Sequence, residues 1–445
     1  MRVAVIGAGV VGLACAATLA QRGYQVRLID PDPPGQGCSG GNAGLFSLSS
    51  FVPLALPGAW AKAPGWLTDP QGPLTIRPAY LPRALPWLWQ LHRSSRVDRV
   101  VASANAMHAL LAPTWDAWLP LAQWAGASGL IRRDGWAAAY RSKAALDGDA
   151  LGWRLRAERG IRIDTLTGGS VREFDPNLSP AITHLLHLPD QGHCLDPLGL
   201  CQALARAVLA QSKSAKGGSA QGVLGAMDGR GADVSVLVPA RALGFEVRDG
   251  RVAQVHTERG AIDVDAVVLA AGAFSGPLAE QLGTRVPLDT ERGYHVTLKS
   301  PSVMPRVPLL EAAGKWFATP MTAGLRLAGT VEFAGLDAPP DWRRAEALLD
   351  QLPNLLPQLS HSDVGHADRW MGRRPSLPDS RPVIGRSPRF ANAVLAFGHA
   401  HVGLTSAAMT GRLVAQLLAG ERPSIDLSPF APDRFGAAPG PWSRH

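Results

Sequence analysis

RVAVIGAGVVG, residues 2–12, is the stretch that decides the fold of this chain. Residues 2–6 have the composition of a short buried strand, and Gly7, Gly9 and Gly12 follow with the spacing G-x-G-x-x-G. In this spacing the first glycine permits a tight turn, the second lets the backbone reach a pyrophosphate, and the third lets a helix pack closely on the strand. The stretch therefore predicts a strand, a phosphate-binding turn and the start of a helix.

The residues that follow complete the same unit. The helix is predicted to run to about Gln21, and a second strand, QVRLID, ends at Asp30. Asp30 lies near the separation at which a carboxylate meets the ribose hydroxyls of a bound dinucleotide. Strand, loop, helix, strand and acid occur in order, which predicts a Rossmann unit that binds the ADP part of a dinucleotide.

A glycine-rich loop, GCSGGNAGLFS at residues 37–47, indicates which dinucleotide this is. FAD and nicotinamide dinucleotides present the same ADP group to this fold, so residues downstream must decide. Gly40, Gly41 and Gly44 flank Asn42 and leave the backbone bare enough to approach a flat ligand, which a nicotinamide enzyme does not need. We predict FAD; the alternative for this loop is a flexible surface segment.

Two later segments suit the same cofactor. AIDVDAVVLAAGAFSG, residues 261–276, reads as a strand that ends in small residues able to pass close to a dinucleotide. GHAHVGLT, residues 398–405, precedes an amphipathic helix predicted from about Leu404 to Leu418. The positive end of that helix dipole suits the negative charge that a reduced flavin carries at N1. An ordinary C-terminal docking helix is the alternative.

Composition sets wider limits. The chain has 445 residues, 46% of them hydrophobic, and a formal net charge of +8, which is typical of a globular protein with two intertwined domains. No block of Lys and Arg reaches the density of a nucleic-acid arm, so we exclude nucleic acid as a partner. Four cysteines without a CxxC pair make a disulfide framework or a zinc site improbable on spacing grounds.

The N-terminus resembles a signal peptide in its charge and apolar run, but its glycine spacing favours the Rossmann unit. Other apolar stretches are interrupted by Pro, Gly or charge before the roughly 18 residues that a bilayer crossing needs. We therefore expect a cytoplasmic protein, with a peripheral position on the inner face of the cytoplasmic membrane as the alternative.

These segments, in this order, resemble the D-amino acid oxidase superfamily, and most of all the bacterial D-amino acid dehydrogenases. The likeness is carried by GAGVVG, by SGGNAG followed by FVPLALPG, by WLTDPQGPLTIRP, by GRRPSLPDSRPVIG and by GHAHVGLT. It implies non-covalent FAD and a substrate carboxylate met by basic and hydroxyl groups above the flavin ring. The sequence departs from the family at residues 211–235, which are of low complexity, and in ERGYH at 291–295, which resembles relatives that act on cyclic substrates such as hydroxy-D-proline.

Pattern and resemblance together give the expected FAD-binding residues. They are Val5, Gly7, Ala8, Gly9, Val10, Val11, Gly12, Asp30, Ser39, Gly41, Asn42, Ala43, Gly44, Leu45, Ala271, Gly272, Gly372, Gly398, His399, His401, Val402, Gly403, Leu404 and Thr405.

Candidate catalytic residues lie at the substrate end. Arg373 and Arg374 are candidates for the carboxylate, because a guanidinium offers two parallel donors that match its geometry, but the sequence does not choose between them. Tyr294 and His295 occupy a predicted strand, so only one of them should face the flavin, and we favour Tyr294 as a carboxylate donor. His401 is expected near the flavin edge, where it contacts the flavin or assists deprotonation of the amine. The pair His399 and His401 lacks a third ligand at suitable spacing, so no metal is expected.

Seven tryptophans crowd the region from 60 to 124, close to several arginines: Trp60, Trp66, Trp87, Trp89, Trp115, Trp118 and Trp124. We expect them to form the core of the substrate domain. The alternative is a membrane interface, which tryptophan with arginine also favours. A membrane would give the reduced flavin access to a quinone or another respiratory-chain acceptor.

The predicted fold is α/β, with a discontinuous Rossmann-like FAD-binding domain (1–50, 190–278 and 366–431), an inserted α+β substrate domain (51–189 and 279–365) and a C-terminal tail (432–445). The expected reaction is oxidative deamination of a primary or cyclic D-amino acid, with hydride transfer from the α-carbon to flavin N5. Three alternatives remain: a glycine- or sarcosine-type amine oxidase that uses oxygen, a flavin-binding subunit of a larger amine dehydrogenase, and a nicotinamide-linked dehydrogenase.

Overall fold

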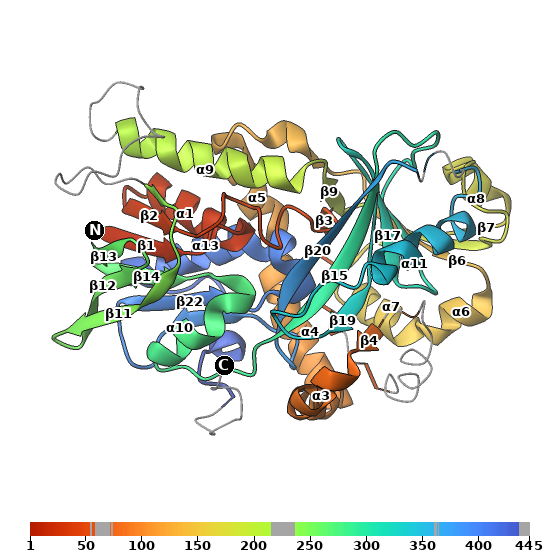
Figure 1. Cartoon of the computed structure of the whole chain (residues 1–445). Coiled ribbons are helices and arrows are strands. Elements are labelled where there is room, and N and C mark those ends of the chain that lie inside the picture. The colour runs from red at the N-terminus through yellow and green to blue at the C-terminus, as the bar shows by residue number, and fades with distance from the viewer. Residues whose placement is uncertain are drawn as a thin grey trace.

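The computed structural model describes residues 1–53, 56–57, 72, 74–214, 236–359, 363 and 365–435. Two halves lie side by side in Figure 1, each built around its own sheet. The longest strands, β15 (Asp289–Leu298) and β20 (Ala367–Ser376), pair along their full length near the junction of the halves. The α/β class and the Rossmann-like dinucleotide unit predicted from the sequence are confirmed.

The dinucleotide half contains a six-stranded sheet assembled from distant parts of the chain. All neighbouring strands are parallel except the edge strand β21. Because both faces of such a sheet are covered, its strands are nearly continuous apolar runs. The order across the sheet is β10 (Leu237–Val238), β2 (Gln25–Ile29), β1 (Arg2–Ile6), β14 (Ala266–Leu269), β22 (Ala393–Phe397) and β21 (Val383–Arg386).

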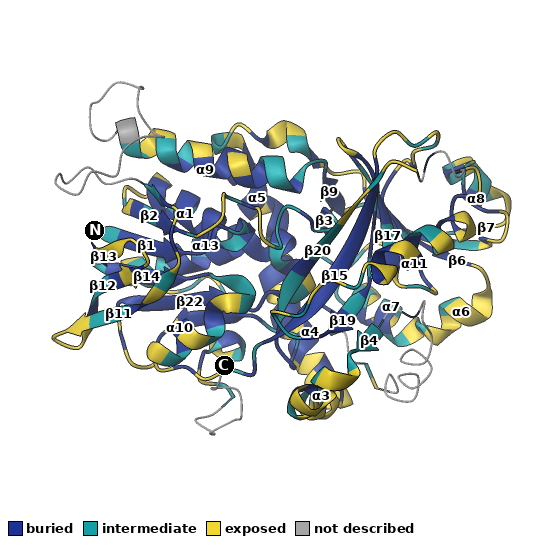
Figure 2. Ribbon diagram, viewed as in Figure 1, coloured by how far each residue is buried: buried dark blue, intermediate teal, exposed yellow. Residues whose placement is uncertain are grey.

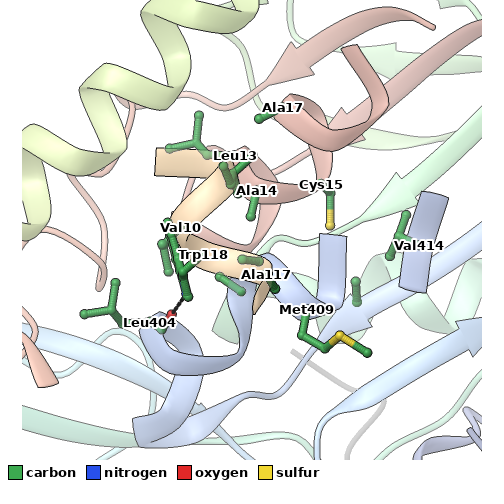
Figure 3. Packing of buried hydrophobic residues seen from close by; sticks show 14 of the residues in the cluster. Val10, Leu13, Ala14, Cys15, Ala17, Ala117, Trp118, Leu404, Met409 and Val414 are labelled. Atoms are coloured by element: carbon green, nitrogen blue, oxygen red, sulfur yellow. Dashed lines mark hydrogen bonds between the residues drawn. The ribbon is translucent and has the colours of Figure 1, made fainter. Parts of the chain in front are cut away.

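One helix pair forms the centre of this half: α1 (Val10–Gln21) and α13 (Gly403–Ala419) pack against each other. A Cβ on Gly411 would lie 2.6 Å from the carbonyl oxygen of Ala14, so the two helices approach backbone to backbone. Figure 3 shows Leu13, Cys15, Met409 and Val414 at this contact. The helices α4 (Val97–Leu111), α5 (Thr114–Trp124) and α9 (Pro197–Ser214) complete the layer.

Two of the seven tryptophans pack in a different part of the molecule from the one expected. Trp115 and Trp118 are buried against the dinucleotide-binding core rather than in the substrate domain, and the indole of Trp118 donates to the carbonyl of Leu404 at 2.9 Å (Figure 3). The apolar faces of α4 and α5 pack on α1 and α13. The domain boundary predicted at residue 51 instead assigns α4 and α5 to the substrate domain. Trp87 packs on Phe333, whereas Trp89 is 62% exposed. Trp124 is partly buried against the core, and Trp60 and Trp66 lie outside the described residues.

Within the described residues, one helix is long and apolar enough to cross a membrane, namely Ala400–Ala419, which includes α13. Of its apolar window, 67% is buried inside the protein. Its contacts with α1 and α5 make it a core helix of the dinucleotide half.

The other face of the dinucleotide sheet is covered by a small antiparallel sheet and a short helix. The sheet consists of β11 (Ala242–Arg248), β12 (Arg251–Thr257) and β13 (Gly260–Asp263), and the helix is α10 (Ser275–Gln281). Another three-stranded sheet, β3 (Leu45–Phe46), β9 (Gly192–Cys194) and β5 (Ile131–Arg132), continues from the loop at residues 37–47.

The second half contains a ten-stranded mixed sheet. Its path is β4 (Leu74–Ile76), β19 (Val331–Phe333), β15, β18 (Gly324–Ala328), β17 (Trp316–Met321), β16 (Leu309–Glu311), β6 (Trp136–Tyr140), β8 (His184–Leu188) and β7 (Asp164–Thr167), with β20 paired to β15. The helices of this half are α3 (Leu81–Ser94), α6 (Lys143–Gly148), α7 (Ala150–Ala157), α8 (Gly169–Phe174) and α11 (Arg343–Gln351).

β20 lies in this second sheet, although the boundary predicted at residue 366 groups it with the FAD domain. Figure 2 shows β15 buried along its length and α3 largely exposed. The low-complexity segment at 211–235 and the predicted tail fall largely outside the described residues.

Substitution of Gly12 tests whether the close packing of α1 on the turn after β1 stabilises the fold. A Cβ there would lie 1.9 Å from the carbonyl oxygen of Gly7, which is backbone and cannot rotate away. We expect Gly12→Ala to lower the free energy of unfolding by about 3 kcal/mol, as overpacking does, measured by urea denaturation. Gly148→Ala in α6, where a Cβ meets nothing within 4 Å, should change stability by less than about 1 kcal/mol. Equal effects of the two substitutions would contradict the packing role of Gly12.

Candidate active site

A cavity of about 840 Å³ is lined by residues of both halves of the molecule. From the dinucleotide half come the turn after β1, the loop at residues 37–47 and the N-terminus of α13; from the other half come parts of β6, β15, β17 and β20. Segments that lie hundreds of residues apart in the sequence therefore meet at one site.

At one end of the cavity, backbone N–H groups and a carboxylate suit the ADP part of a dinucleotide. Gly7 has φ +108°, and a Cβ there would lie 2.3 Å from the carbonyl oxygen of Ala270, so only glycine fits this turn. Asp30 accepts from the N–H groups of Ala8 at 2.6 Å and Asp32 at 2.9 Å. Burial raises the pKa of Asp30, and these two N–H donors oppose the rise.

The loop at residues 37–47 is held in place by side chains from both halves. Asn42 bonds the carbonyl of Ser39 at 2.5 Å and the N–H of Gly44 at 2.6 Å, and the guanidinium of Arg326 donates to the carbonyl of Asn42 at 2.7 Å. Ser39 itself accepts from the N–H of Val10, at the start of α1, at 2.9 Å. The loop is therefore a rigid wall of the cavity and not a free surface segment.

β15 and β20 complete this wall. His295 bonds the carbonyl of Gly41 at 2.7 Å and stacks on Trp370, with ring centroids 4.9 Å apart. A Cβ on Gly41 would lie 2.2 Å from the Trp370 ring, which explains the glycine by close packing against an indole. Burial, and to a lesser degree the neighbouring Arg326, lowers the pKa of His295 to about 3, so its ring is neutral and structural.

The N-terminus of α13 forms the opposite wall. Ala400 has φ +46°, an uncommon conformation for a residue with a side chain, and it sits between the two histidines. The Thr405 hydroxyl donates to the carbonyl of Leu45 and accepts from the N–H of Ser47, which joins α13 to the glycine-rich loop. Both histidines line the cavity, but His399 is buried and bonds Thr410 at 3.0 Å, whereas His401 is exposed.

Most of the predicted FAD-binding residues line this cavity together. Val5, Gly12 and Gly44 do not: Val5 is inside β1, Gly12 packs α1 on the turn, and Gly44 accepts a bond from the N–H of Cys194. The role of each lining residue in binding FAD stays a prediction.

The residues present fit FAD. The cavity offers a pyrophosphate turn without side chains, a carboxylate at the ribose position and the positive end of a 17-residue helix. Among the described residues, no group of three or more His, Cys, Asp or Glu side chains is arranged to hold a metal ion.

Strand register separates the two arginines. Arg374 lies on the same face of the β15–β20 pair as Gly293, because a Cβ on Gly293 would lie 2.1 Å from its guanidinium. That face also carries Trp370 and His295, which contact the glycine-rich loop. Arg373 has the opposite orientation, and its Nε donates to the carbonyl of Leu336 at 2.6 Å. Both residues line the cavity, but Arg374 shares its face with the cofactor loop.

Tyr294 and His295 take opposite faces, as strand alternation requires. The Tyr294 hydroxyl donates to Glu332 at 2.6 Å and accepts from the N–H of Asp341 at 2.9 Å. Both of its hydrogen-bonding functions are thus used inside the protein, and the side chain is fully buried. Tyr294 still contributes to the cavity lining, and its role as a substrate ligand stays a prediction, whereas His295 contacts the cofactor loop.

The sequence reasoning missed several lining residues at the end of the cavity away from Asp30. They are Ser47, Ser50, Trp136, Arg156, Lys315 and Phe317. They come from a loop, from α7, from β6 and from around β17, and no local motif connects them. Only the tertiary fold brings them to one place.

The comparisons with known proteins agree with this geometry. The FAD dependent oxidoreductase family matches residues 2–417, and the chain belongs to this family. It is 42% identical over 437 residues to a D-amino-acid oxidase of Bradyrhizobium diazoefficiens, covering 97% of this chain and 98% of that protein. It is 30% identical to a D-amino acid dehydrogenase of the same organism, with 98% and 99% covered. FAD is therefore the cofactor, and the chain is an oxidoreductase.

A solved structure with the same fold is the iminodiacetate oxidase from Chelativorans sp. BNC1, with a TM-score of 0.69 over 97% of this chain and 99% of that one. At 20% identity this likeness supports the fold alone. The resemblance to the D-amino acid oxidase superfamily inferred from the motifs is confirmed.

The enclosed histidines predict how stability depends on pH. Burial lowers the pKa of His399 to about 3, whereas an unfolded histidine titrates near 6.5. Below about pH 6.5 the imidazole of His399 is protonated in the unfolded chain but stays neutral in the folded protein. The free energy of unfolding therefore falls as the pH drops from 7 to 5. We expect His399→Gln to remove up to about 2 kcal/mol of that loss, measured as the unfolding free energy at both pH values. His256→Gln, at a side chain 46% exposed on β12, is the control. An unchanged pH dependence in His399→Gln would contradict this expectation.

Proposed function

We propose that this chain oxidises the Cα–N bond of a D-amino acid, primary or cyclic, to an imine that water hydrolyses to the oxo acid. The observation that carries the proposal is Arg374, whose guanidinium lines the cavity on the face of β20 that meets the cofactor loop. The names of the two relatives from Bradyrhizobium diazoefficiens, at 42% and 30% identity over nearly the whole chain, support the choice of substrate class.

In this proposal Arg374 binds the substrate carboxylate. Its Nη1 donates to the carbonyl of Thr330 at 3.0 Å, which fixes the side chain and leaves its other donors for a ligand. A planar guanidinium holds a carboxylate through two parallel bonds and so orients the α-carbon. Bound FAD supplies the hydride acceptor, so no strong protein base is required.

His401 can assist with the amine. Although His401 is exposed to the cavity, desolvation by the surrounding protein, and then Arg374 and Arg156, lower its pKa to about 4, so the imidazole is neutral over the physiological range. A neutral imidazole can accept a hydrogen bond from the substrate amine and help to keep it unprotonated before oxidation.

The test is an anaerobic spectrum of the purified FAD-loaded protein, mixed in turn with paired D- and L-amino acids, both hydroxyproline epimers, glycine and sarcosine. We expect D-amino acids, and not their L-enantiomers, to bleach the oxidised-flavin band at about 450 nm. Bleaching by L-enantiomers alone would refute the proposal. Bleaching by glycine or sarcosine, with peroxide formed in air, would favour the amine-oxidase alternative, and a yellow protein that no substrate bleaches would favour a flavin-binding subunit.

Arg374 and Arg373 form a matched pair for steady-state kinetics. We expect Arg374→Lys to raise the KM for the amino acid about 10- to 100-fold, since a charged bidentate contact is lost. Arg373→Lys should change KM by less than about threefold, because Arg373 lies on the face of β20 opposite to the one that meets the cofactor loop. A larger effect at Arg373 than at Arg374 would reverse the assignment.

The acceptor of the electrons is a separate proposal. We propose a quinone or another respiratory-chain acceptor, reached through peripheral contact of the protein with the inner face of the cytoplasmic membrane. The support is α3, on which Leu81, Leu85 and Trp89 are 41%, 54% and 62% exposed at a spacing of four residues, so they share one face. The next helix, α4, adds Val97, which is 61% exposed. The sequence from residue 83 to residue 99 contains four arginines and one acidic residue, Asp98. Apolar side chains beside arginines suit the surface of an anionic bilayer.

Sedimentation with lipid vesicles tests this contact. We expect the protein to bind vesicles that contain phosphatidylglycerol, and the double variant Leu85→Glu, Trp89→Glu to bind at least about tenfold more weakly. Val247→Glu, at a residue 43% exposed on β11, is the matched control. If the double variant and the unaltered protein sediment equally, α3 is not the membrane contact.

A further inference from the structure

The end of the cavity away from Asp30 contains a partly exposed cation that the proposed reaction does not use. Arg156 of α7 lines the cavity beside Ser47 and Ser50. Its Nε donates to the carbonyl of Ser49 at 3.1 Å, its Nη1 donates to the carbonyl of Gly152 at 3.1 Å, and its guanidinium lies 4.9 Å from the centre of the Trp153 ring. These contacts fix the side chain, but all of them are with neutral groups.

Within the part of the chain that the structure describes, Arg156 forms no direct ion pair. Among the described residues no carboxylate lies within 4.0 Å of its guanidinium, and the nearby Asp149 is bound to Lys315 Nζ at 2.6 Å and to the Tyr140 hydroxyl at 3.0 Å. Burial lowers the pKa of Arg156 to about 10, which still leaves it charged at neutral pH. A cation at a cavity wall, with no carboxylate partner among the described residues, can bind an anionic group of a ligand.

The count of charges around this end of the cavity leads to the same conclusion. Arg156, Lys315, Arg373 and Arg374 line it, against Glu291 in the lining and Asp149 behind Lys315. Among the described residues this end of the cavity therefore carries an excess of cations, which favours anionic groups on a ligand.

Arg156 is also close to the place where the substrate would react. His401, Arg374 and Arg156 line the same cavity, and the positive charges of both arginines help to lower the pKa of His401. Trp136 and Phe317, whose ring centroids are 5.4 Å apart at 81°, line the cavity beside them and offer an apolar surface for methylene groups. The two guanidiniums, one imidazole and two aromatic rings therefore line one cavity.

We propose that Arg156 binds a second anionic group on the substrate, so that the preferred substrates are acidic D-amino acids with the α-carboxylate at Arg374 and the side-chain carboxylate at Arg156. This inference rests on the proposed oxidation of D-amino acids and restricts the preferred substrates to those with an acidic side chain. Lys315, already neutralised by Asp149, contributes less than Arg156.

The experiment compares D-glutamate with D-glutamine, which have nearly the same shape and differ in charge. With an artificial electron acceptor, we expect the unaltered FAD-loaded enzyme to favour D-glutamate in kcat/KM by about 10- to 100-fold, the value of one hydrogen-bonded charge pair. Arg156→Gln should bring this ratio close to one, and Arg156→Lys should keep it above one. Because a general structural defect lowers both rates together, the ratio isolates the charge interaction. Arg154→Gln, at an exposed arginine of the same helix, is the control and should leave the ratio unaltered.

A second measurement does not depend on turnover. We expect glutarate, which has no amine to oxidise, to bind the FAD-loaded enzyme more tightly than butyrate, and Arg156→Gln to remove that difference, as measured by calorimetry. D-Alanine distinguishes the two ways of failing. If D-alanine and D-glutamine are oxidised at least as well as D-glutamate, or if the ratio is the same in Arg156→Gln, the acidic-substrate inference is overturned and the D-amino acid reaction stands. If no D-amino acid is oxidised, the proposed function itself fails, and glutarate binding alone then tests the anion site.

Discussion

The close approach of α1 to the turn after β1 is the contact on which the rest of the structure depends. Gly12 packs directly on the carbonyl of Gly7, and the Gly7 turn packs on the carbonyl of Ala270 at the end of β14. These contacts leave no room for a Cβ, so the backbone itself forms the wall of the cavity. α13 packs on α1 in the same close way, because Gly411 of α13 lies directly against the carbonyl of Ala14 in α1. Together the glycines set both helix N-termini at one cavity, where their dipoles favour negative charge.

The paired strands β15 and β20 give the second constraint. Because successive side chains point to opposite faces, the pair divides its residues between the cofactor loop and the core of the second half. His295, Trp370 and Arg374 belong to the first face, and Tyr294 belongs to the second. A register shift of one residue would exchange these roles, so the continuous pairing from Asp289 to Leu298 fixes the chemistry of the site as well as the sheet.

Electrostatics follows from burial. The three histidines that contact the cofactor loop or flank Ala400 have depressed pKa values, so the site carries its positive charge on arginines that remain ionised and not on imidazoles. Arginine suits this task because its pKa is high enough to withstand desolvation. The cavity is therefore cationic over a wide range of pH, which suits a carboxylate substrate and a flavin that becomes negative when reduced.

The sequence by itself determined the α/β class, the Rossmann turn, FAD and the family, because these depend on local spacing: three glycines, an acid at the end of the next strand, and short glycine-bounded loops. Most of the cofactor-binding residues that it predicted, from Gly7 to Thr405, line one cavity. It did not separate Arg373 from Arg374, since that depends on which face of a paired strand each occupies. It placed Trp115 and Trp118 in the wrong half, because an amphipathic helix shows that it has a buried face but not which surface covers it. Arg156 could not be found at all: its importance comes from its place in the cavity lining beside residues of other elements, and such neighbours exist only after the chain has folded.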